Sequence, residues 1–158
     1  MAELNVVLHE PEIPSNTGNI GRTCLATGAR LHLVKPLGFS IDDRQLRRAG
    51  LDYWQELDVR LWESLEEVLA ATAEERRFFF TTKGRRPYYE AEYERGDWLF
   101  FGRETKGLPE RVLAEYAADC VTIPMVGAAP GTQGARSLNL SVAVGVAVFE
   151  AQRQFATL

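Results

Sequence analysis

The chain has 158 residues, a length typical of one domain that is large enough to bury a hydrophobic core. Its 18 basic and 22 acidic residues leave a net charge of −4, and 46% of its residues are hydrophobic. This balance excludes a uniformly basic nucleic-acid binder and a disordered polyelectrolyte, but it allows a basic patch on an acidic body.

The first half of the chain alternates predicted strands and helices. Apolar residues at Leu4–Leu8 predict a buried strand, and the prolines and glycine of Glu10–Gly18 predict a loop after it. Apolar positions at helical spacing predict a helix over Asn16–Thr27, which Gly28 ends. The next predicted elements are a strand at Leu31–Lys35, a helix from Asp42-Asp43 to Ala49 with Gly50 as its stop, a weak strand at Val59–Trp62, and a helix from the capping box at Ser64 to Ala73.

The second half of the chain continues this alternation. Three phenylalanines within Arg77–Thr82 predict a central strand, and the polar stretch Lys83–Asp97 predicts a loop with one helical turn. The elements predicted after them are a strand at Trp98–Phe101, a helix at Pro109–Ala117, a strand at Cys120–Ile123, a loop at Val126–Gly134 and a helix at Leu138–Phe155. The last helix is almost entirely apolar over Val142–Phe149, so we expect a second subunit to cover its outer face.

The order of the elements predicts the fold class. Strands and helices alternate without a linker or a long repeat, which predicts a single α/β domain over residues 1–158, with a mostly parallel sheet and helices on both faces. Two cysteines are too few for a disulfide framework, and no apolar run approaches the roughly 18 residues of a membrane helix. The N-terminal residues do not resemble a signal peptide. We therefore expect a cytoplasmic protein that does not enter a membrane.

Several familiar site motifs are absent. The glycines after the first strand lack the G-x-G-x-x-G spacing of a nicotinamide site. Gly102–Gly107 has the glycine spacing of a P-loop, but Leu108 stands where a lysine is required. His9 and His32 have no cysteine or acid at ligand spacing, so the sequence predicts no metal site. Ser137 lacks the G-x-S-x-G context of a hydrolase nucleophile.

Three late strands end in loops of distinctive composition, at Thr81–Gly84, Gly102–Pro109 and Pro124–Val126. In an open parallel sheet, ligands bind beyond the carboxyl ends of the strands. Glycines allow the backbone to approach a flat ligand, and the apolar Phe80, Ile123 and Leu138 are candidates to sandwich an aromatic ring. The alternative, equally consistent with the spacing, is that these glycines and prolines only shape turns.

Three stretches resemble the motifs of the SPOUT family of RNA methyltransferases: Glu12–Arg22, Phe101–Pro109, and Ile123–Met125 with Ser137–Ser141. These stretches stand in the family's order, and the resemblance covers nearly the whole chain. Within the family, the sequence most resembles the small bacterial enzymes that methylate the wobble cytidine or uridine of tRNA. The resemblance implies a C-terminal trefoil knot, a homodimer, S-adenosylmethionine as cofactor, and the anticodon region of tRNA as partner. The segment Gly127–Ala135 is longer than the resemblance leads us to expect.

The resemblance also implies roles for single residues. Arg22 matches the catalytic arginine, and because a guanidinium stays protonated we expect it to bind the adjacent phosphate and stabilise a developing alkoxide. A role as base, assisted by the substrate phosphate, stays open. The polar motif positions Asn16, Glu104 and Asn139 are expected to orient Arg22 or the ribose. The residues expected to hold the cofactor are Phe80, Gly102 and Ile123 through their backbone, completed by Ser137 and Leu138.

Two basic clusters are candidates for RNA binding on this acidic chain. They are Arg22, Arg30, Lys35, Arg44, Arg47 and Arg48 in the first, and Lys83, Arg85 and Arg86 in the second. Tyr88, Tyr89 and Tyr93 follow the second cluster and are candidates to stack on unpaired bases, or they form an ordinary surface loop. The alternative functions are ribose methylation at another tRNA position or in rRNA, and RNA binding without catalysis.

Overall fold

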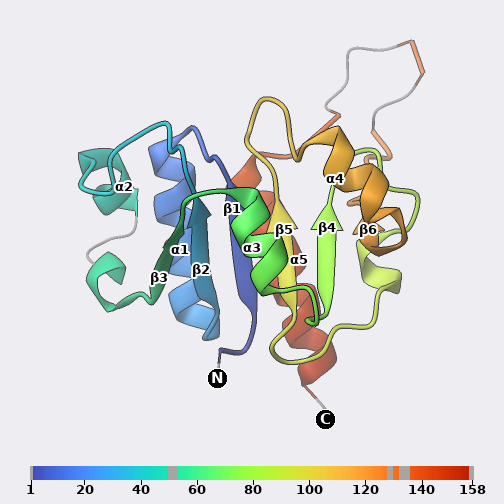
Figure 1. The fold of residues 1–158 in the computed structure, drawn as a ribbon, viewed down its shortest axis with the longest axis horizontal. Coiled ribbons are helices and arrows are strands. Elements are labelled where there is room, and N and C mark those ends of the chain that lie inside the picture. The colour runs from blue at the N-terminus through green and yellow to red at the C-terminus, as the bar shows by residue number, and fades with distance from the viewer. Residues whose placement is uncertain (1, 50–52, 128–129, 132–135, 157–158) are drawn as a thin grey trace.

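The computed structural model describes residues 2–49, 53–127, 130–131 and 136–156 (Figure 1). Its centre is a parallel sheet with strand order β3-β2-β1-β5-β4-β6. The strands are β1 (Asn5–His9), β2 (Arg30–Val34), β3 (Val59–Trp62), β4 (Arg77–Phe80), β5 (Trp98–Phe101) and β6 (Cys120–Val121). The helices are α1 (Pro14–Thr27), α2 (Arg44–Ala49), α3 (Leu65–Ala71), α4 (Glu110–Glu115) and α5 (Leu140–Phe155), with 3₁₀ turns at Tyr53–Glu56, Tyr88–Glu90 and Ala117–Asp119.

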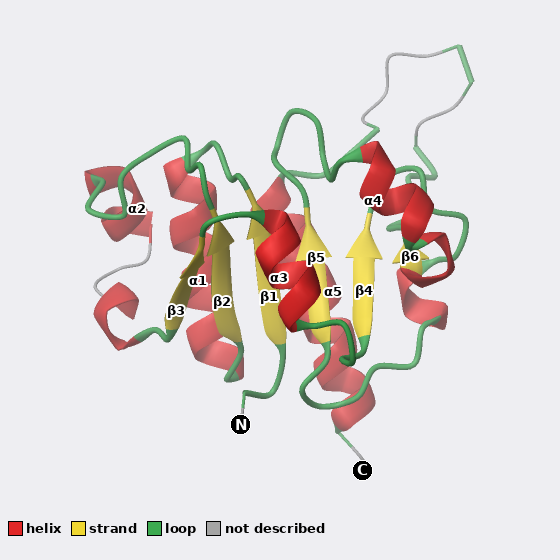
Figure 2. Cartoon of the chain, viewed as in Figure 1, coloured by secondary structure: helices red, strands yellow, loops and turns green. Residues whose placement is uncertain are grey.

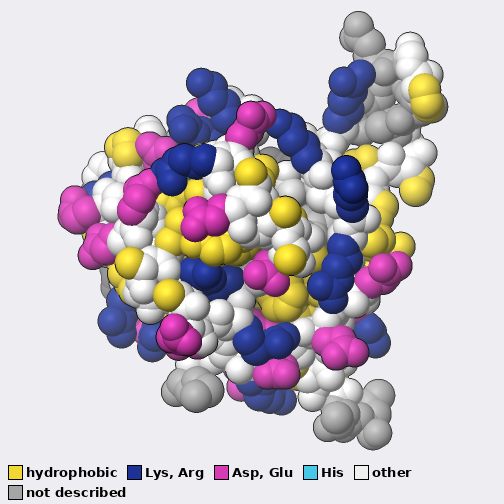
Figure 3. Space-filling view, turned by 45° about the vertical axis from the view of Figure 1, so that its right-hand side comes forward, with side chains coloured by type: hydrophobic (Ala, Val, Ile, Leu, Met, Phe, Trp, Pro, Cys, Tyr) yellow, Lys and Arg dark blue, Asp and Glu magenta, His cyan; other side chains and the backbone are white. Residues whose placement is uncertain are grey.

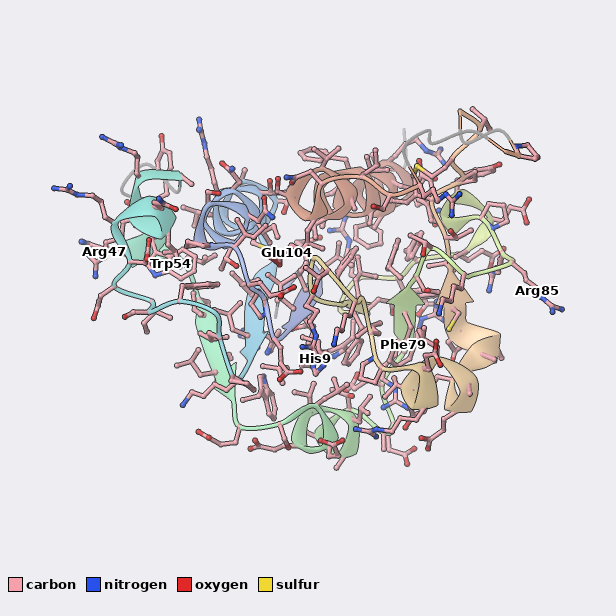
Figure 4. The ribbon with its side chains drawn as sticks, turned by 90° about the horizontal axis from the view of Figure 1, so that it is seen from above. His9, Arg47, Trp54, Phe79, Arg85 and Glu104 are labelled. Carbon is pink, nitrogen blue, oxygen red and sulfur yellow. The ribbon has the colours of Figure 1, made fainter. Side chains whose placement is uncertain are left out.

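Helices cover both faces of the sheet. Helices α1 and α5 lie on one face, and α3 and α4 lie on the other (Figures 2 and 4). Alternate side chains of a strand point to opposite faces, so Phe78 and Phe80 of β4 pack on the side of α1 and α5, whereas Phe79 packs on the side of α3 and α4. Burial on both faces explains why the strands read as continuous apolar runs. The predicted α/β architecture is confirmed.

The strand order places several loops together. From β1 the chain builds outward through β2 and β3, and then crosses to the other side of β1 to form β4, β5 and β6. All strands point the same way, so the loops that follow β1, β4, β5 and β6 emerge at one edge of the sheet, at the top of Figure 1. A crevice beside such a reversal of strand order is the usual ligand site of an open α/β sheet.

The first helix begins earlier than predicted. Pro14 is its first residue, so the predicted loop was wrong over residues 14–18. Proline suits this position because its fixed φ is already helical and its missing N–H needs no partner. The free N–H groups before it, of Glu12 and Ile13, donate to the carboxylate of Glu104 at distances between 2.7 and 3.1 Å. This cap comes from a residue more than 90 positions away, which no local pattern could reveal.

Other boundaries also differ from the prediction. Helix α5 starts at Leu140 rather than Leu138, because the side chain of Asn139 accepts the N–H of Ser141 at 2.9 Å and caps the helix. Strand β6 ends at Val121 rather than Ile123. Elements β4, α3 and α4 are each two residues shorter at their C-terminal ends, at Phe80, Ala71 and Glu115. The predicted stop at Gly50 and most of the predicted loop at Val126–Gly134 lie outside the described residues.

Helix α5 has one buried and one open face. Its buried face packs Val144, Ala147, Val148 and Ala151 into the core. On the outer face Val142 is 51% and Phe149 57% exposed in the single chain. None of the helices in the described part of the chain is long and apolar enough to cross a membrane.

Candidate functional site

The loops at the carboxyl edge of the sheet enclose a cavity of about 600 Å³. Its walls come from the loops after β1, β4, β5 and β6 and from the first residues of α5. Eight of the nine predicted site residues line it: Asn16, Phe80, Gly102, Glu104, Ile123, Ser137, Leu138 and Asn139. The ninth, Arg22, does not belong to its lining. Residues far apart in sequence therefore meet in one place, as the motifs predict.

The wall after β5 is a tight turn that depends on two glycines. A Cβ added to Gly102 would lie 1.9 Å from the carbonyl carbon of Gly107, a distance at which no side chain fits. Gly107 has a φ of +68°, which favours glycine, and its N–H donates to the carbonyl of Arg103 at 2.9 Å. The glycines thus shape a turn, and that turn forms one wall of the cavity.

The apolar part of the lining is continuous with the core. The ring of Phe80 is only 7% exposed and stacks on Phe101, with 4.6 Å between the ring centres. Leu138, on the opposite segment, is 39% exposed. Phe80, Ile123 and Leu138 border the same cavity, so the predicted candidates for an aromatic sandwich lie around one space.

The polar candidates mostly hold the framework. Glu104 accepts the N–H groups of Glu12 and Ile13, and it lies near the centre of the molecule in Figure 4. Asn139 accepts both the N–H and the hydroxyl of Ser141, the latter at 2.6 Å. Asn16 is 5% exposed and borders the cavity from the first turns of α1. In this structure Glu104 and Asn139 therefore orient loops and a helix end rather than Arg22.

Arg22 lies on the exposed side of α1. Its guanidinium carbon stands 5.9 Å from the ring centre of Tyr53, a cation–π contact that sequence reasoning missed. Six residues separate it from Asn16, which corresponds to about 9 Å along a helix. The guanidinium is thus open to a ligand that approaches from solvent, and within this single chain it lies outside the cavity.

The second predicted basic cluster lies away from the α2 arginines of the first, whose Arg30 and Lys35 pair with Asp58 and Glu63 near β2. Figure 4 shows Arg47 on α2 at one end and Arg85 at the other. Acidic side chains are interspersed among the basic ones on the face shown in Figure 3. At the rim of the cavity Lys83 pairs with Glu110 at 2.8 Å, and the lysine lowers the pKa of that carboxyl. One chain thus carries two separate basic regions, not a single patch.

Only part of the predicted tyrosine cluster is exposed enough to stack on an unpaired base. Tyr93 is 6% exposed, its hydroxyl donates to the carbonyl of Tyr88 at 2.6 Å, and its ring packs 4.9 Å from that of Phe78. Base stacking by Tyr93 is therefore excluded, because the ring is part of the core. Tyr89 is 52% exposed, and its ring stands edge-on to that of Tyr88 with 5.4 Å between the ring centres.

Both histidines contact neighbouring side chains of the fold. His32 is buried between the side chains of Asn5 and Trp62, each at 3.0 Å from one ring nitrogen. Burial lowers its pKa to about 3, so the ring is neutral. His9 contacts Glu10 at 2.8 Å. Within the described residues, no group of three or more His, Cys, Asp or Glu side chains is placed to hold a metal ion.

The chain forms a parallel α/β sheet, and glycine-containing loops at the carboxyl ends of its strands enclose a partly apolar cavity. Proteins with this arrangement are a class that binds a small, partly flat ligand in such a cavity. Residues 3–149 match the model of the SpoU rRNA Methylase family, and the chain belongs to this family.

Individual relatives extend along nearly the whole chain. The chain is 48% identical over 152 residues to the tRNA (cytidine(34)-2′-O)-methyltransferase of Escherichia coli strain K12, which covers 96% of this chain and 93% of the relative. A solved structure described as giving insights into the 2-OH methylation of C/U34 on tRNA matches with a TM-score of 0.88 and 48% identity, over 98% of this chain and 97% of the other. An AdoMet-bound rRNA methyltransferase from Sinorhizobium meliloti matches with a TM-score of 0.83 and 26% identity, over 98% of this chain and 57% of the other.

Proposed function

We propose that this chain is a tRNA 2′-O-methyltransferase that transfers a methyl group from S-adenosylmethionine to the ribose of cytidine or uridine 34. The relatives that match along nearly the whole chain bear the name of this activity. The observation that carries the proposal is the convergence of eight predicted site residues around one cavity. The chain acts in the cytoplasm, where bacterial tRNA is modified.

The cavity residues fit the proposed cofactor. Phe80, Ile123 and Leu138 offer apolar surface for a flat base, and the turn that begins at Gly102 offers backbone groups for its edge. Ser137 adds a hydroxyl to the lining of the same cavity. When bound, S-adenosylmethionine supplies an electrophilic methyl group on a sulfonium, so the protein's task is alignment and charge stabilisation.

Arg22 acts on the RNA side of the reaction. Its guanidinium stays protonated at any physiological pH, so it binds a phosphate next to the reacting ribose. In the same position it stabilises the negative charge that develops on the 2′-oxygen as the proton leaves. Asn16, on the same helix, orients the ribose at the mouth of the cavity, and Asn139 and Glu104 keep the neighbouring backbone in register.

The assembly is a homodimer of single-domain subunits whose C-terminal segment is threaded as a trefoil knot. The exposed Val142 and Phe149 on α5 support a covered face, because an apolar helix face costs free energy in water. A second copy of the chain covers this face. Sedimentation of the purified protein tests the dimer, and Phe149→Asp is expected to shift it toward monomer.

The activity is tested by incubating the protein with labelled S-adenosylmethionine and tRNA transcripts that carry cytidine or uridine at position 34. The expected result is a 2′-O-methylated nucleoside at position 34, and no transfer to a transcript with 2′-deoxyribose at that position. Arg22→Ala is expected to abolish transfer while cofactor binding is kept, and Arg60→Ala, at the exposed edge strand, serves as the matched control.

Other outcomes contradict the proposal in distinct ways. Methylation at another tRNA position or of rRNA assigns a different RNA substrate to the same chemistry. Retention of RNA without any methylated nucleoside identifies a binding protein without catalysis. Loss of cofactor binding in Arg22→Ala would show that Arg22 holds the cofactor and does not act on the RNA.

A further inference from the structure

The loop after β1 and the loop after β5 are joined by reciprocal hydrogen bonds. The carboxylate of Glu12 accepts the N–H of Thr105 at 3.0 Å and its hydroxyl at 2.8 Å. In the opposite direction, the carboxylate of Glu104 accepts the N–H of Glu12 and that of Ile13, the latter at 2.7 Å. We call these bonds among Glu12, Ile13, Glu104 and Thr105 the loop interlock.

Two neighbouring contacts support the loop interlock. Arg103, beside Glu104, pairs with Glu10 at 3.2 Å. On the other side, the N–H of Gly38 donates to the carbonyl of Pro11 at 2.9 Å, and a Cβ added to Gly38 would lie 2.8 Å from the carbonyl oxygen of Glu12. The backbone at Glu12 is therefore held from both sides.

The charge of Glu12 strengthens its bonds. The N–H and hydroxyl of Thr105 hold the pKa of the Glu12 carboxyl below its usual range. Hydrogen bonds to a carboxylate are roughly twice as strong as neutral ones. Glu12 itself does not line the cavity, whereas its partner Thr105 does. Any effect of Glu12 on a ligand therefore passes through the loop that it holds.

We propose that Glu12 is a positioning residue that fixes the wall at residues 102–107 to the start of α1. This helix carries Asn16 and Arg22, so the loop interlock keeps the cofactor wall and the RNA-facing helix in one geometry. The inference rests on the proposed function, because it assigns the loop after β5 to the cofactor and helix α1 to the RNA. Small misalignment of reacting groups is costly, so a residue remote from the chemistry can limit the rate.

The test measures single-turnover methyl transfer to tRNA at saturating cofactor. Glu12→Ala removes both acceptor bonds and is expected to lower the rate at least about tenfold. Glu12→Gln keeps an acceptor oxygen of the same reach and is expected to retain a rate within about threefold of the unmodified protein. Thr105→Val is expected to be slower than Thr105→Ser, which keeps the hydroxyl. Glu63→Ala removes an exposed carboxylate with a surface ion pair and serves as the control.

Coupling between the two residues separates positioning from general loss of structure. The double variant Glu12→Ala/Thr105→Val is expected to be no slower than Glu12→Ala alone, because one interaction is removed in each case. Multiplicative effects, or a full rate in Glu12→Ala at saturating cofactor, would overturn the proposal.

Two further readouts keep this inference separate from the proposed function. If the protein binds S-adenosylhomocysteine but does not methylate tRNA, the proposed function fails, and Glu12→Ala is still expected to weaken binding of this probe about tenfold relative to Glu12→Gln. If the unmodified protein does not bind the probe, hydrogen exchange decides. Amides in residues 102–107 are expected to exchange faster in Glu12→Ala, and unchanged exchange would overturn the loop interlock.

Discussion

The cavity region and the α2 region are held in place by different kinds of contact. Around the cavity, carboxylates and backbone groups more than 90 residues apart bond to each other, as Glu104 does with Ile13. At α2 the support is local: the carboxylate of Asp43 accepts the N–H of Gln45 at 2.7 Å, and Leu46 is fully buried against α1, where its carbonyl would lie 2.2 Å from a Cβ added to Gly18. The arginines of α2 are exposed, and Arg47 pairs with Asp42, five positions earlier.

This difference matches what each region is proposed to do. Methyl transfer requires reacting atoms to be aligned closely, and directional hydrogen bonds restrict geometry. Attraction of RNA acts over about 8 Å at physiological salt and tolerates movement of the charges. The comparison teaches that directional bonds between distant segments occur where alignment matters, whereas local bonds and helix packing suffice to present charge. The following variants test this division.

The largest effect is expected from Gly102→Ala. The new Cβ would lie 1.9 Å from the carbonyl carbon of Gly107, so the turn cannot close. We expect loss of about 3 kcal/mol of folding stability and at least about a hundredfold weaker binding of S-adenosylhomocysteine. Calorimetric titration and urea unfolding measure both quantities. Gly107→Ala meets open space and suffers only its positive φ, so it is the milder control, at about 1 kcal/mol.

Gly18→Ala is expected to disturb the other region. Its Cβ would collide with the carbonyl of Leu46 and with Ala49, and α2 must shift at a cost of about 2 kcal/mol. The expected functional result is weaker tRNA binding with unchanged affinity for S-adenosylhomocysteine, whereas Gly102→Ala weakens that affinity. An equal loss of both affinities in Gly18→Ala would show that the two regions are not separable.

Removal of charge from α2 is expected to have a smaller, salt-dependent effect. Arg44→Ala/Arg48→Ala removes two exposed cations without touching Leu46. We expect about tenfold weaker tRNA binding at low salt, and a slope of log affinity against log salt that is smaller by about 2. Filter binding over a salt series measures both. The matched pair Arg60→Ala/Arg95→Ala, outside the α2 region, leaves the slope unchanged if the α2 region binds RNA.

The last prediction is a pH dependence of stability that belongs to the sheet between the two regions and leaves the site's geometry unchanged. Burial lowers the pKa of His32 to about 3, from an ordinary value of 6.5. Between these values the unfolded chain binds a proton that the folded protein does not, so acid lowers the free energy of unfolding by up to about 1.4 kcal/mol per pH unit. His32→Gln cannot titrate, and urea unfolding from pH 6.5 to 4 should show a flatter dependence. A parallel dependence in both proteins would contradict this assignment.

The sequence predicted the secondary structure well where burial is periodic. The three phenylalanines of β4 predict a central strand because both faces of that strand are covered. The cap at Ser64 was readable because its partner, the N–H of Glu67, is three residues away. Prediction was less successful where the partner is distant: the start of α1 depends on Glu104, and the burial of Tyr93 depends on Phe78 of β4.

The candidate site shows the same limit. Eight of its nine predicted residues border one cavity, because the motifs stand at the carboxyl ends of strands that the fold brings together. Glu12 belongs to the first of the three motifs, but no local pattern showed that its carboxylate reaches Thr105. The bonds of Glu104 to backbone rather than to Arg22 were equally invisible in the order of residues.

By itself, the order of residues determined which segments become strands and helices, since alternation and helical spacing decide which side chains each segment can bury. Only the three-dimensional arrangement decided the neighbours of each strand, the contact of Glu12 with Thr105 and the separation of the two basic clusters. The physical reason is distance along the chain: a hydrogen bond between residues more than 90 positions apart exists only after the strand order has brought its two ends together.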